Sequence, residues 1–307
     1  MRARPVPLLA TLLALGSVAS LSHASPPGAP GVSVPLHALR QPCLDPRFPR
    51  LAGPWVVGCG TSGHVDRALS LASGRLVMLP RPLARASTGP SVVFGTGAAG
   101  GWFRLEESGA TENHDVARVN EGLLAPATTD GVHIALLSER GLQAYDAESS
   151  QRRLHAVQPM GWHAPALAWP WVAWVEDAGD GDPDVWIRNA TKQTPARALA
   201  TGPGRQDRVV GRDGWIGWID EGDVVLLEPV SGRERRLEAN TGFHSPATVW
   251  NGEACWETRG ADLDIVCSDM DGISGPGHQS VPDRWGHWLL YRDGEQPMLY
   301  TAPSEAE

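Results

Sequence analysis

The sequence predicts an all-β protein built from a repeated unit, and three observations support this. The chain of 307 residues holds 35 glycines and 26 prolines, a density of turn-forming residues that helical proteins do not have. Its apolar residues come in short β-branched and aromatic runs, such as 171–175, that end at glycine and aspartate clusters. No stretch after Leu21 keeps the apolar period of an amphipathic helix.

Similar segments recur along the chain about every 40 residues. The two clearest copies start at Pro165 and Pro246, and weaker copies start near residues 49, 90, 126, 209 and 282. Each copy has room for about four short strands, and four strands per repeat of this length are typical of a propeller blade. We therefore predict one β-propeller over residues 49–307, with seven four-stranded blades and six as the alternative.

The two clearest copies share a pattern of residues. Residues 163–166 and 244–247 read H-A-P-A and H-S-P-A. In the first copy, W-V-A-W-V-E-D at 171–177 and D-V-W at 184–186 follow. This pattern resembles the WD40-like (PD40-type) repeats of TolB-type β-propellers. The resemblance implies the fold and no particular activity, because propellers serve binding, lyase, lactonase and scaffold roles. The additional α/β domain of TolB-type proteins is not expected before residue 49.

The first 24 residues have the features of an export signal. Arg2 and Arg4 precede an apolar stretch over 8–21 that is too short to span a bilayer, and small residues occupy positions 22 and 24. We predict cleavage after Ala24 and a mature protein in the periplasm or outside the cell. No cysteine for a lipid anchor follows, and no later apolar run is long enough for a membrane span.

Residues 25–48 are predicted to be an N-terminal extension that contains a closing strand. The stretch 31–39 alternates apolar and other residues, whereas the chain after Pro282 has room for only about three strands. A strand from this stretch can complete the last blade and protect its edge.

Four cysteines allow three pairings in an oxidising compartment. Cys255 and Cys267 fall on adjacent predicted strands at similar distances from the turn between them. Cys43 follows the closing strand, and Cys59 lies on the second strand of the first blade. We therefore predict the disulfides Cys43–Cys59 and Cys255–Cys267, and the absence of a C-x-x-C motif argues against a zinc site.

The first strand of each blade lines the channel of a propeller, so the residues that open these strands meet at one mouth. His163, Asp207 and His244 open three successive blades. Two imidazoles and a carboxylate can bind a divalent metal such as zinc or share a proton. The trio is thus a candidate ligand or metal site, with solvated polar residues at the mouth as the alternative. No catalytic residue or other cofactor is predicted.

A second candidate for a cation is an acidic loop. Carboxylate oxygens are ligands of hard cations such as Ca²⁺, but Pro183 interrupts this loop, and aspartates in such turns commonly bond the backbone instead. Both interpretations stay open for these four residues, which are Asp177, Asp180, Asp182 and Asp184.

Ten of the 13 tryptophans fall into two groups. One group falls at equivalent places in or beside the second strands and is predicted to pack between blades: Trp171, Trp174, Trp215, Trp218, Trp256 and Trp288. The other group lies outside the second strands, and an exposed aromatic platform for a carbohydrate is to be sought among its members: Trp162, Trp169, Trp250 and Trp285.

Charge narrows the possible partners. The chain has 26 Lys and Arg against 35 Asp and Glu, a net charge of −9, which disfavours nucleic acid. We predict a monomeric, non-catalytic binding module for a protein or glycan partner in the cell envelope. The alternative is a lyase or hydrolase at the channel mouth that acts on a carbohydrate or lactone, with or without a metal.

Overall fold

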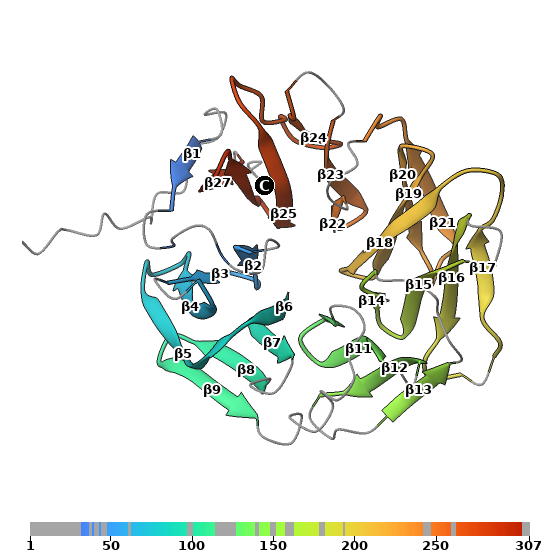
Figure 1. Ribbon diagram of the computed structural model, residues 1–307, viewed down its shortest axis with the longest axis horizontal. Coiled ribbons are helices and arrows are strands. Elements are labelled where there is room, and N and C mark those ends of the chain that lie inside the picture. The colour runs from blue at the N-terminus through green and yellow to red at the C-terminus, as the bar shows by residue number, and fades with distance from the viewer. Residues whose placement is uncertain are drawn as a thin grey trace, which may run out of the picture.

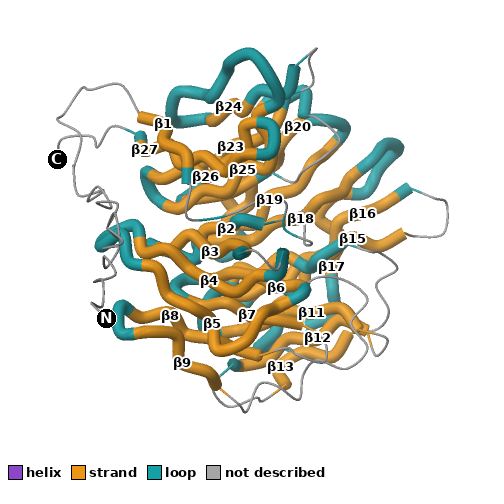
Figure 2. The backbone as a smooth tube through the Cα atoms, turned by 60° about the vertical axis from the view of Figure 1, so that its left-hand side comes forward, coloured by secondary structure: helices purple, strands orange, loops and turns teal. Residues whose placement is uncertain are grey.

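The computed structural model is a seven-bladed β-propeller, with its blades arranged around a central axis (Figure 1). It describes residues 32–36, 39, 43, 48–60, 63–96, 101–113, 127–138, 141–147, 152–156, 163–177, 182–192, 194–241, 247–258 and 262–302. The regular elements of this part of the chain are all strands (Figure 2), and it contains no apolar helix of membrane-spanning length.

The strands of each blade follow one another outward from the axis as antiparallel neighbours. Blade one comprises β2 (Arg50–Leu51), β3 (Trp55–Cys59), β4 (Val65–Ser70) and β5 (Leu76–Leu83). Blade two comprises β6 (Arg85–Gly89), β7 (Val92–Thr96), β8 (Gly101–Glu106) and β9 (Gly109–Asn113). Blade three comprises β10 (Thr128–Thr129), β11 (His133–Ser138), β12 (Gly141–Asp146) and β13 (Arg152–Ala156).

The remaining blades follow in chain order. Blade four comprises β14 (Ala166–Ala168), β15 (Trp171–Asp177), β16 (Pro183–Asn189) and β17 (Arg197–Ala200). Blade five comprises β18 (Gln206–Arg212), β19 (Trp215–Asp220), β20 (Asp223–Glu228) and β21 (Arg233–Leu237). Blade six comprises β22 (Thr248–Trp250), β23 (Glu253–Glu257) and β24 (Ile265–Cys267). Blade seven comprises β25 (Gln279–Trp285), β26 (Trp288–Asp293), β27 (Gln296–Thr301) and β1 (Val32–Pro35).

The structure confirms seven blades and corrects two details. Blade six has three strands among the described residues, and a single bridge between Ile265 and Ile273 stands where a fourth strand is expected. The glycines and proline of 272–277 interrupt a longer pairing there. Blade two begins at Arg85 rather than near residue 90, because its inner strand reads R-A-S-T-G and has only Ala86 as an apolar signal.

The N-terminal strand closes the ring, as predicted. Strand β1 pairs antiparallel with β27 from Val32 opposite Thr301 to Pro35 opposite Met298, and it lies beside β27 in Figure 1. Leu36 and Leu39 follow it and are each 4% exposed. They pack in one cluster with residues of blades one and seven, so the segment is part of the interface that joins the first blade to the last.

Each contact between neighbouring blades contains one cluster of buried apolar side chains. A flat blade cannot bury both faces by itself, so its core forms only against its neighbours. The predicted packing role of the first tryptophan group agrees with this. Trp174, Trp215, Trp218 and Trp256 are buried, and Trp171 and Trp288 are partly buried against the clusters.

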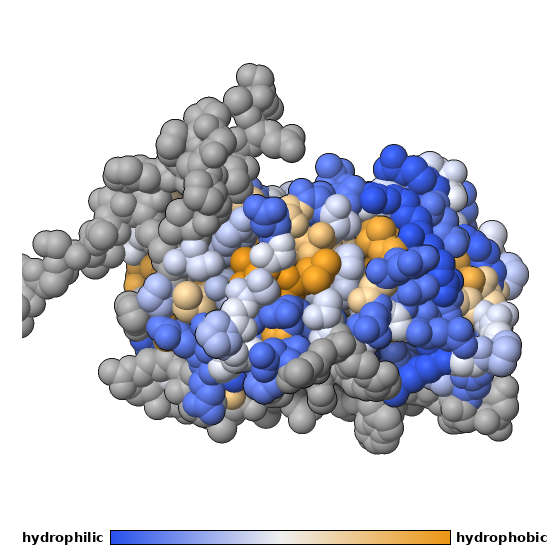
Figure 3. Space-filling view, turned by 90° about the horizontal axis from the view of Figure 1, so that it is seen from above, coloured by the Kyte–Doolittle hydropathy of each residue, from blue (hydrophilic) through white to orange (hydrophobic). Residues whose placement is uncertain are grey.

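Much of the face seen in Figure 3 is hydrophilic. In the view of Figure 3, hydrophilic side chains interrupt the apolar patches. Among the described residues, the exposed large apolar side chains are Leu76, Met78, Val132 and Val230. The first two lie on β5, and the other two belong to separate blades, so these residues do not form one large apolar surface.

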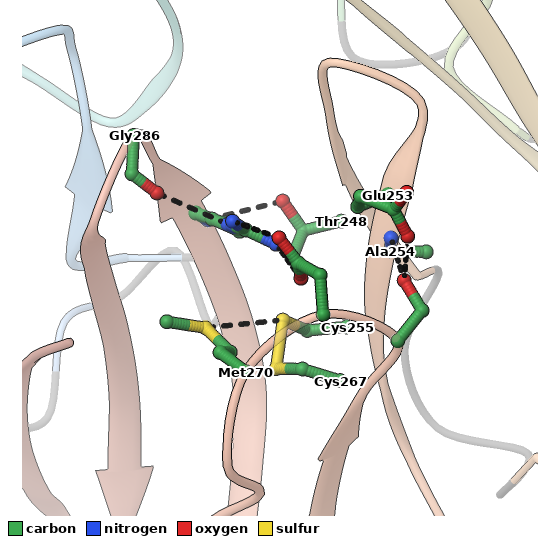
Figure 4. The surroundings of a disulfide bond; sticks show 10 residues. Thr248, Glu253, Ala254, Cys255, Cys267, Met270 and Gly286 are labelled. Atoms are coloured by element: carbon green, nitrogen blue, oxygen red, sulfur yellow. Dashed lines mark hydrogen bonds and ion pairs between the residues drawn. A yellow bond between two sulfur atoms is a disulfide. The ribbon is translucent and has the colours of Figure 1, made fainter. Parts of the chain in front are cut away.

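Both predicted disulfides are present. Cys43 is bonded to Cys59 on β3, and Cys255 on β23 is bonded to Cys267 on β24, its direct antiparallel partner. Figure 4 shows the second bond, with the Sδ atom of Met270 4.0 Å from the Sγ atom of Cys255. The first disulfide ties the closing segment to blade one, and the second ties two strands of the short sixth blade.

Removal of residues 25–36 from the mature protein should lower its stability and expose the edge of β27 to intermolecular pairing. The loss of the buried Leu36 side chain alone contributes about 1.5–3 kcal/mol. Thermal unfolding with light scattering is the measurement, and a protein shortened only to Gly31 is the control. Equal melting of the two proteins would contradict the closing role.

Replacement of Cys43 and Cys59 by serine should cost about 3 kcal/mol of unfolding free energy, since the bond closes a loop of about 15 residues. Denaturant unfolding of the purified exported protein measures this cost. Peptide mapping without reductant should recover both disulfide-linked pairs, and four free thiols in the exported protein would refute the assignment.

Candidate functional site

A central cavity of about 620 Å³ lies at the axis of the propeller and is the candidate functional site. Inner strands and the turns that follow them supply most of its lining, and blades one to seven all contribute. A concave site of this size suits a small ligand or one segment of a larger partner. The ring architecture therefore brings together side chains that are up to 237 positions apart, from Phe48 to Trp285.

Three tryptophans mark one end of this cavity. Trp169 follows β14, and Trp250 and Trp285 end β22 and β25, so all three stand where an inner strand turns into the second strand of its blade. We call them the tryptophan rim. They belong to the group in which the sequence predicted an exposed aromatic platform, whereas Trp162 lies outside the described residues.

Two of these rings form a corner. The ring centroids of Trp250 and Trp285 are 4.5 Å apart, with an angle of 53° between the ring planes. The guanidinium of Arg212, which ends β18, lies 5.6 Å from the centre of the Trp285 ring. Trp285 also packs against the buried cluster between blades seven and one, but Trp250 is in no cluster of the described core. The position of Trp250 is thus not explained by core packing.

A buried carboxylate holds this corner in place. The Asp283 side chain is 2% exposed, and it accepts a hydrogen bond of 2.7 Å from the Leu51 backbone N–H and one of 2.9 Å from Arg212 Nη1. Arg50 Nη1 lies 3.8 Å from the same carboxylate, and Arg212 Nη1 also donates to the backbone oxygen of Arg284. Asp283 therefore links blades one, five and seven.

On the wall formed by blades three and four, an aromatic stack borders the cavity. The rings of His133 and Trp169 are parallel to within 5°, with centroids 3.6 Å apart. Asp130 fixes the histidine, because its Oδ2 atom lies 3.0 Å from His133 Nδ1 and its Oδ1 atom accepts the N–H groups of Val132 and His133. One face of the Trp169 ring is thus covered by a neighbouring blade.

Toward the start of the inner strands, the cavity is bordered by His163 and Arg208. His163 has an exposed side, but the protein atoms around the rest of its ring lower its pKa, and the charges of Arg205 and Arg208 add to this effect against the opposing charge of Asp207. The imidazole is therefore neutral at pH 7 and adds no positive charge to the cavity.

A bulge in β18 separates two neighbouring residues at this end. Arg208 has a positive φ of 58°, and the pairing of β18 with β19 shifts between Asp207 and Val210. Such a bulge turns a side chain to the other face. Arg208 consequently borders the cavity, whereas Asp207 is 2% exposed and pairs with Arg205 at 2.6 Å and Arg208 at 3.8 Å.

The structure describes only some of the residues of the two predicted cation sites. His163 reaches the cavity, Asp207 is engaged in its ion pairs, and His244 lies outside the described residues, so the metal site of this trio stays a prediction. In the acidic loop, Asp182 accepts the N–H of Gly204 at 2.9 Å and Asp184 is buried. Asp180 and the side chain of Asp177 are not described, and the calcium loop also stays a prediction.

Comparison with known proteins confirms the fold and goes no further. No family model and no curated protein matches the chain. The β-propeller domain of the Trilobed protease from Pyrococcus furiosus, with its open velcro topology, is 8% identical over 85% of this chain and 93% of that chain, with a TM-score of 0.56. This chain is a β-propeller protein.

Two further structures extend the comparison. PorZ, a surface component of the type-IX secretion system of Porphyromonas gingivalis, is 12% identical over 84% of this chain and 36% of that chain, with a TM-score of 0.53. A putative TolB from Agrobacterium tumefaciens is 14% identical over 53% of this chain and 66% of that chain, with a TM-score of 0.35. The likeness to PorZ shows a shared fold alone, and the TolB match supports no conclusion at this TM-score, so membership of the TolB-type repeat family stays a prediction.

Replacement of Asp283 by asparagine should lower the free energy of unfolding by about 3–5 kcal/mol, because it leaves the Arg212 charge without its buried partner. Urea unfolding measures the effect. Glu295→Gln, in the exposed turn between β26 and β27, is the matched control and should change stability by no more than about 0.5 kcal/mol. Equal stability of the two variants would show that the Asp283 network does not hold the blades together.

Proposed function

We propose that this protein is a non-catalytic binding module of the cell envelope whose central cavity holds part of a protein or glycan partner. The observation that carries the proposal is the tryptophan rim at the end of a cavity of about 620 Å³. Large aromatic side chains contribute most to binding when they line a concave site, because they bury a large area with few rotatable bonds.

The contrast between the two tryptophan groups supports this proposal. Trp174, Trp215, Trp218 and Trp256 are nearly inaccessible to water and fill the contacts between blades. The rim tryptophans retain accessible surface and border the cavity. An apolar surface that folding leaves accessible in a concave place is a characteristic of binding sites.

Two of the three aspartates that border the cavity, Asp283 and Asp130, are engaged with the protein itself. Asp283 is surrounded by two guanidiniums and a backbone N–H, and Asp130 is bonded to His133 and two backbone N–H groups. Both carboxylates thus hold neighbouring groups of the cavity wall in place. Lyase or hydrolase chemistry is therefore the less favoured alternative.

Two disulfides in the structure fit an oxidising compartment, which supports a location in the periplasm or outside the cell. The export signal over residues 1–24 is part of this proposal. In that compartment, the partners within reach are envelope proteins, glycans and material from outside the cell.

Screening of the mature protein against a glycan array and a library of peptides tests the proposal. We expect a ligand whose affinity falls at least tenfold in Trp250→Ala, since this residue borders the cavity and belongs to no core cluster. Met78→Ala, at an exposed position on β5, is the control and should bind as the wild type does. A screen without any ligand, or ligands that bind both variants equally, would contradict a binding function of the cavity.

A further inference from the structure

We propose that the ligand of the central cavity is an acidic oligosaccharide, a short chain of sugar units with carboxylate groups, recognised by Arg212 and the Trp250–Trp285 corner. This inference rests on the proposed function and assigns its ligand class. It follows from the hydrogen-bonding groups that the cavity offers, from the unoccupied guanidinium nitrogens of Arg212 and from the shape of the aromatic corner.

The tryptophan rim offers hydrogen-bond donors. Within the described part of the chain, none of Trp169, Trp250 and Trp285 donates its indole N–H to a protein acceptor, and none of these nitrogen atoms is among those sealed from water. Among the core tryptophans, Trp174 donates to Glu176 and Trp256 donates to the backbone oxygen of Ala239, each at 3.1 Å, whereas Trp218 Nε1 is sealed from water without an acceptor. The rim donors are therefore available to a ligand.

Arg212 adds charged donors at the same place. Its Nη1 atom serves Asp283 and the backbone oxygen of Arg284, and in the described residues no acceptor engages Nε or Nη2. The side chain is 17% exposed and borders the cavity. Asp283 fixes the guanidinium before a ligand arrives, and a planar guanidinium held in this way suits the two oxygens of a carboxylate.

The aromatic corner fits the other half of such a ligand. A sugar ring has an apolar C–H face and a rim of oxygen atoms, and the C–H face packs against the electron-rich face of an indole ring. The corner angle of 53° between Trp250 and Trp285 can support one sugar ring while its neighbour reaches Arg212. Stacking on the indole rings would thus bind the sugar ring, and the guanidinium of Arg212 would select for its carboxylate group.

Titration of the mature protein with trimers of galacturonic, mannuronic and guluronic acid tests this inference, with the methyl ester of each trimer as its uncharged counterpart. Calorimetry and tryptophan fluorescence report the binding. We expect at least one acid to bind with one-to-one stoichiometry, and its ester to bind at least tenfold more weakly.

Variants separate the two recognition elements. Arg212→Gln should bind acid and ester alike, whereas Trp250→Ala should weaken both at least tenfold. Arg212→Lys keeps the charge beside Asp283 but not the planar fork, and it should lose at least part of the preference for the acid even if Arg212→Gln fails to fold. Arg236→Gln, on the outer strand β21 and paired with Asp220 and Asp223, is the control and should bind as the wild type does.

Three results would overturn the inference: no acid binds, acid and ester bind equally, or the Arg212 variants keep the full preference. Binding of a neutral sugar or a peptide that Trp250→Ala abolishes would also overturn it, but this result would leave the proposed binding function intact. Loss of every ligand class would contradict both.

Discussion

The closure of the ring is the constraint on which the rest of this structure depends. Each blade buries its apolar residues only against its two neighbours, so an open ring would leave one blade face and one strand edge exposed to water. Strand β1 resolves this by completing blade seven, and Leu36 and Leu39 then fill the contact between blades seven and one. A segment at one end of the chain thus determines whether the other blades can pack.

The same closure creates the cavity. Because the wide outer parts of the blades set the packing between them, the narrow inner strands are left around an axis that they do not fill. Asp283 accepts hydrogen bonds from Leu51 of blade one and Arg212 of blade five. The same carboxylate therefore helps to close the ring and fixes the cavity wall. Side chains at the ends of inner strands are then held in place by the fold without being buried by it.

Prediction from the sequence succeeded for features whose residue pattern recurs in each blade. The second strands, the buried tryptophans and the cross-strand cysteines recur or face each other at fixed spacing, so their roles can be deduced from the repeat. The inner strands carry a weaker signal, because four of the seven have three residues or fewer and some of their residues border the cavity rather than the core. Blade two was therefore placed one strand too late, and Arg50, Arg212 and Asp283 were not anticipated.

The sequence by itself determined the all-β class, the seven repeats, the closing strand and both disulfides, since each depends on local pattern and on spacing along the chain. It also singled out Trp169, Trp250 and Trp285, together with Trp162, as tryptophans outside the second strands. Only the tertiary structure decided that these rings share the end of one cavity with Arg212, and that a bulge brings Arg208 to the cavity while Asp207 is buried. The physical reason is that these positions depend on how distant blades meet at the axis, which no local pattern records.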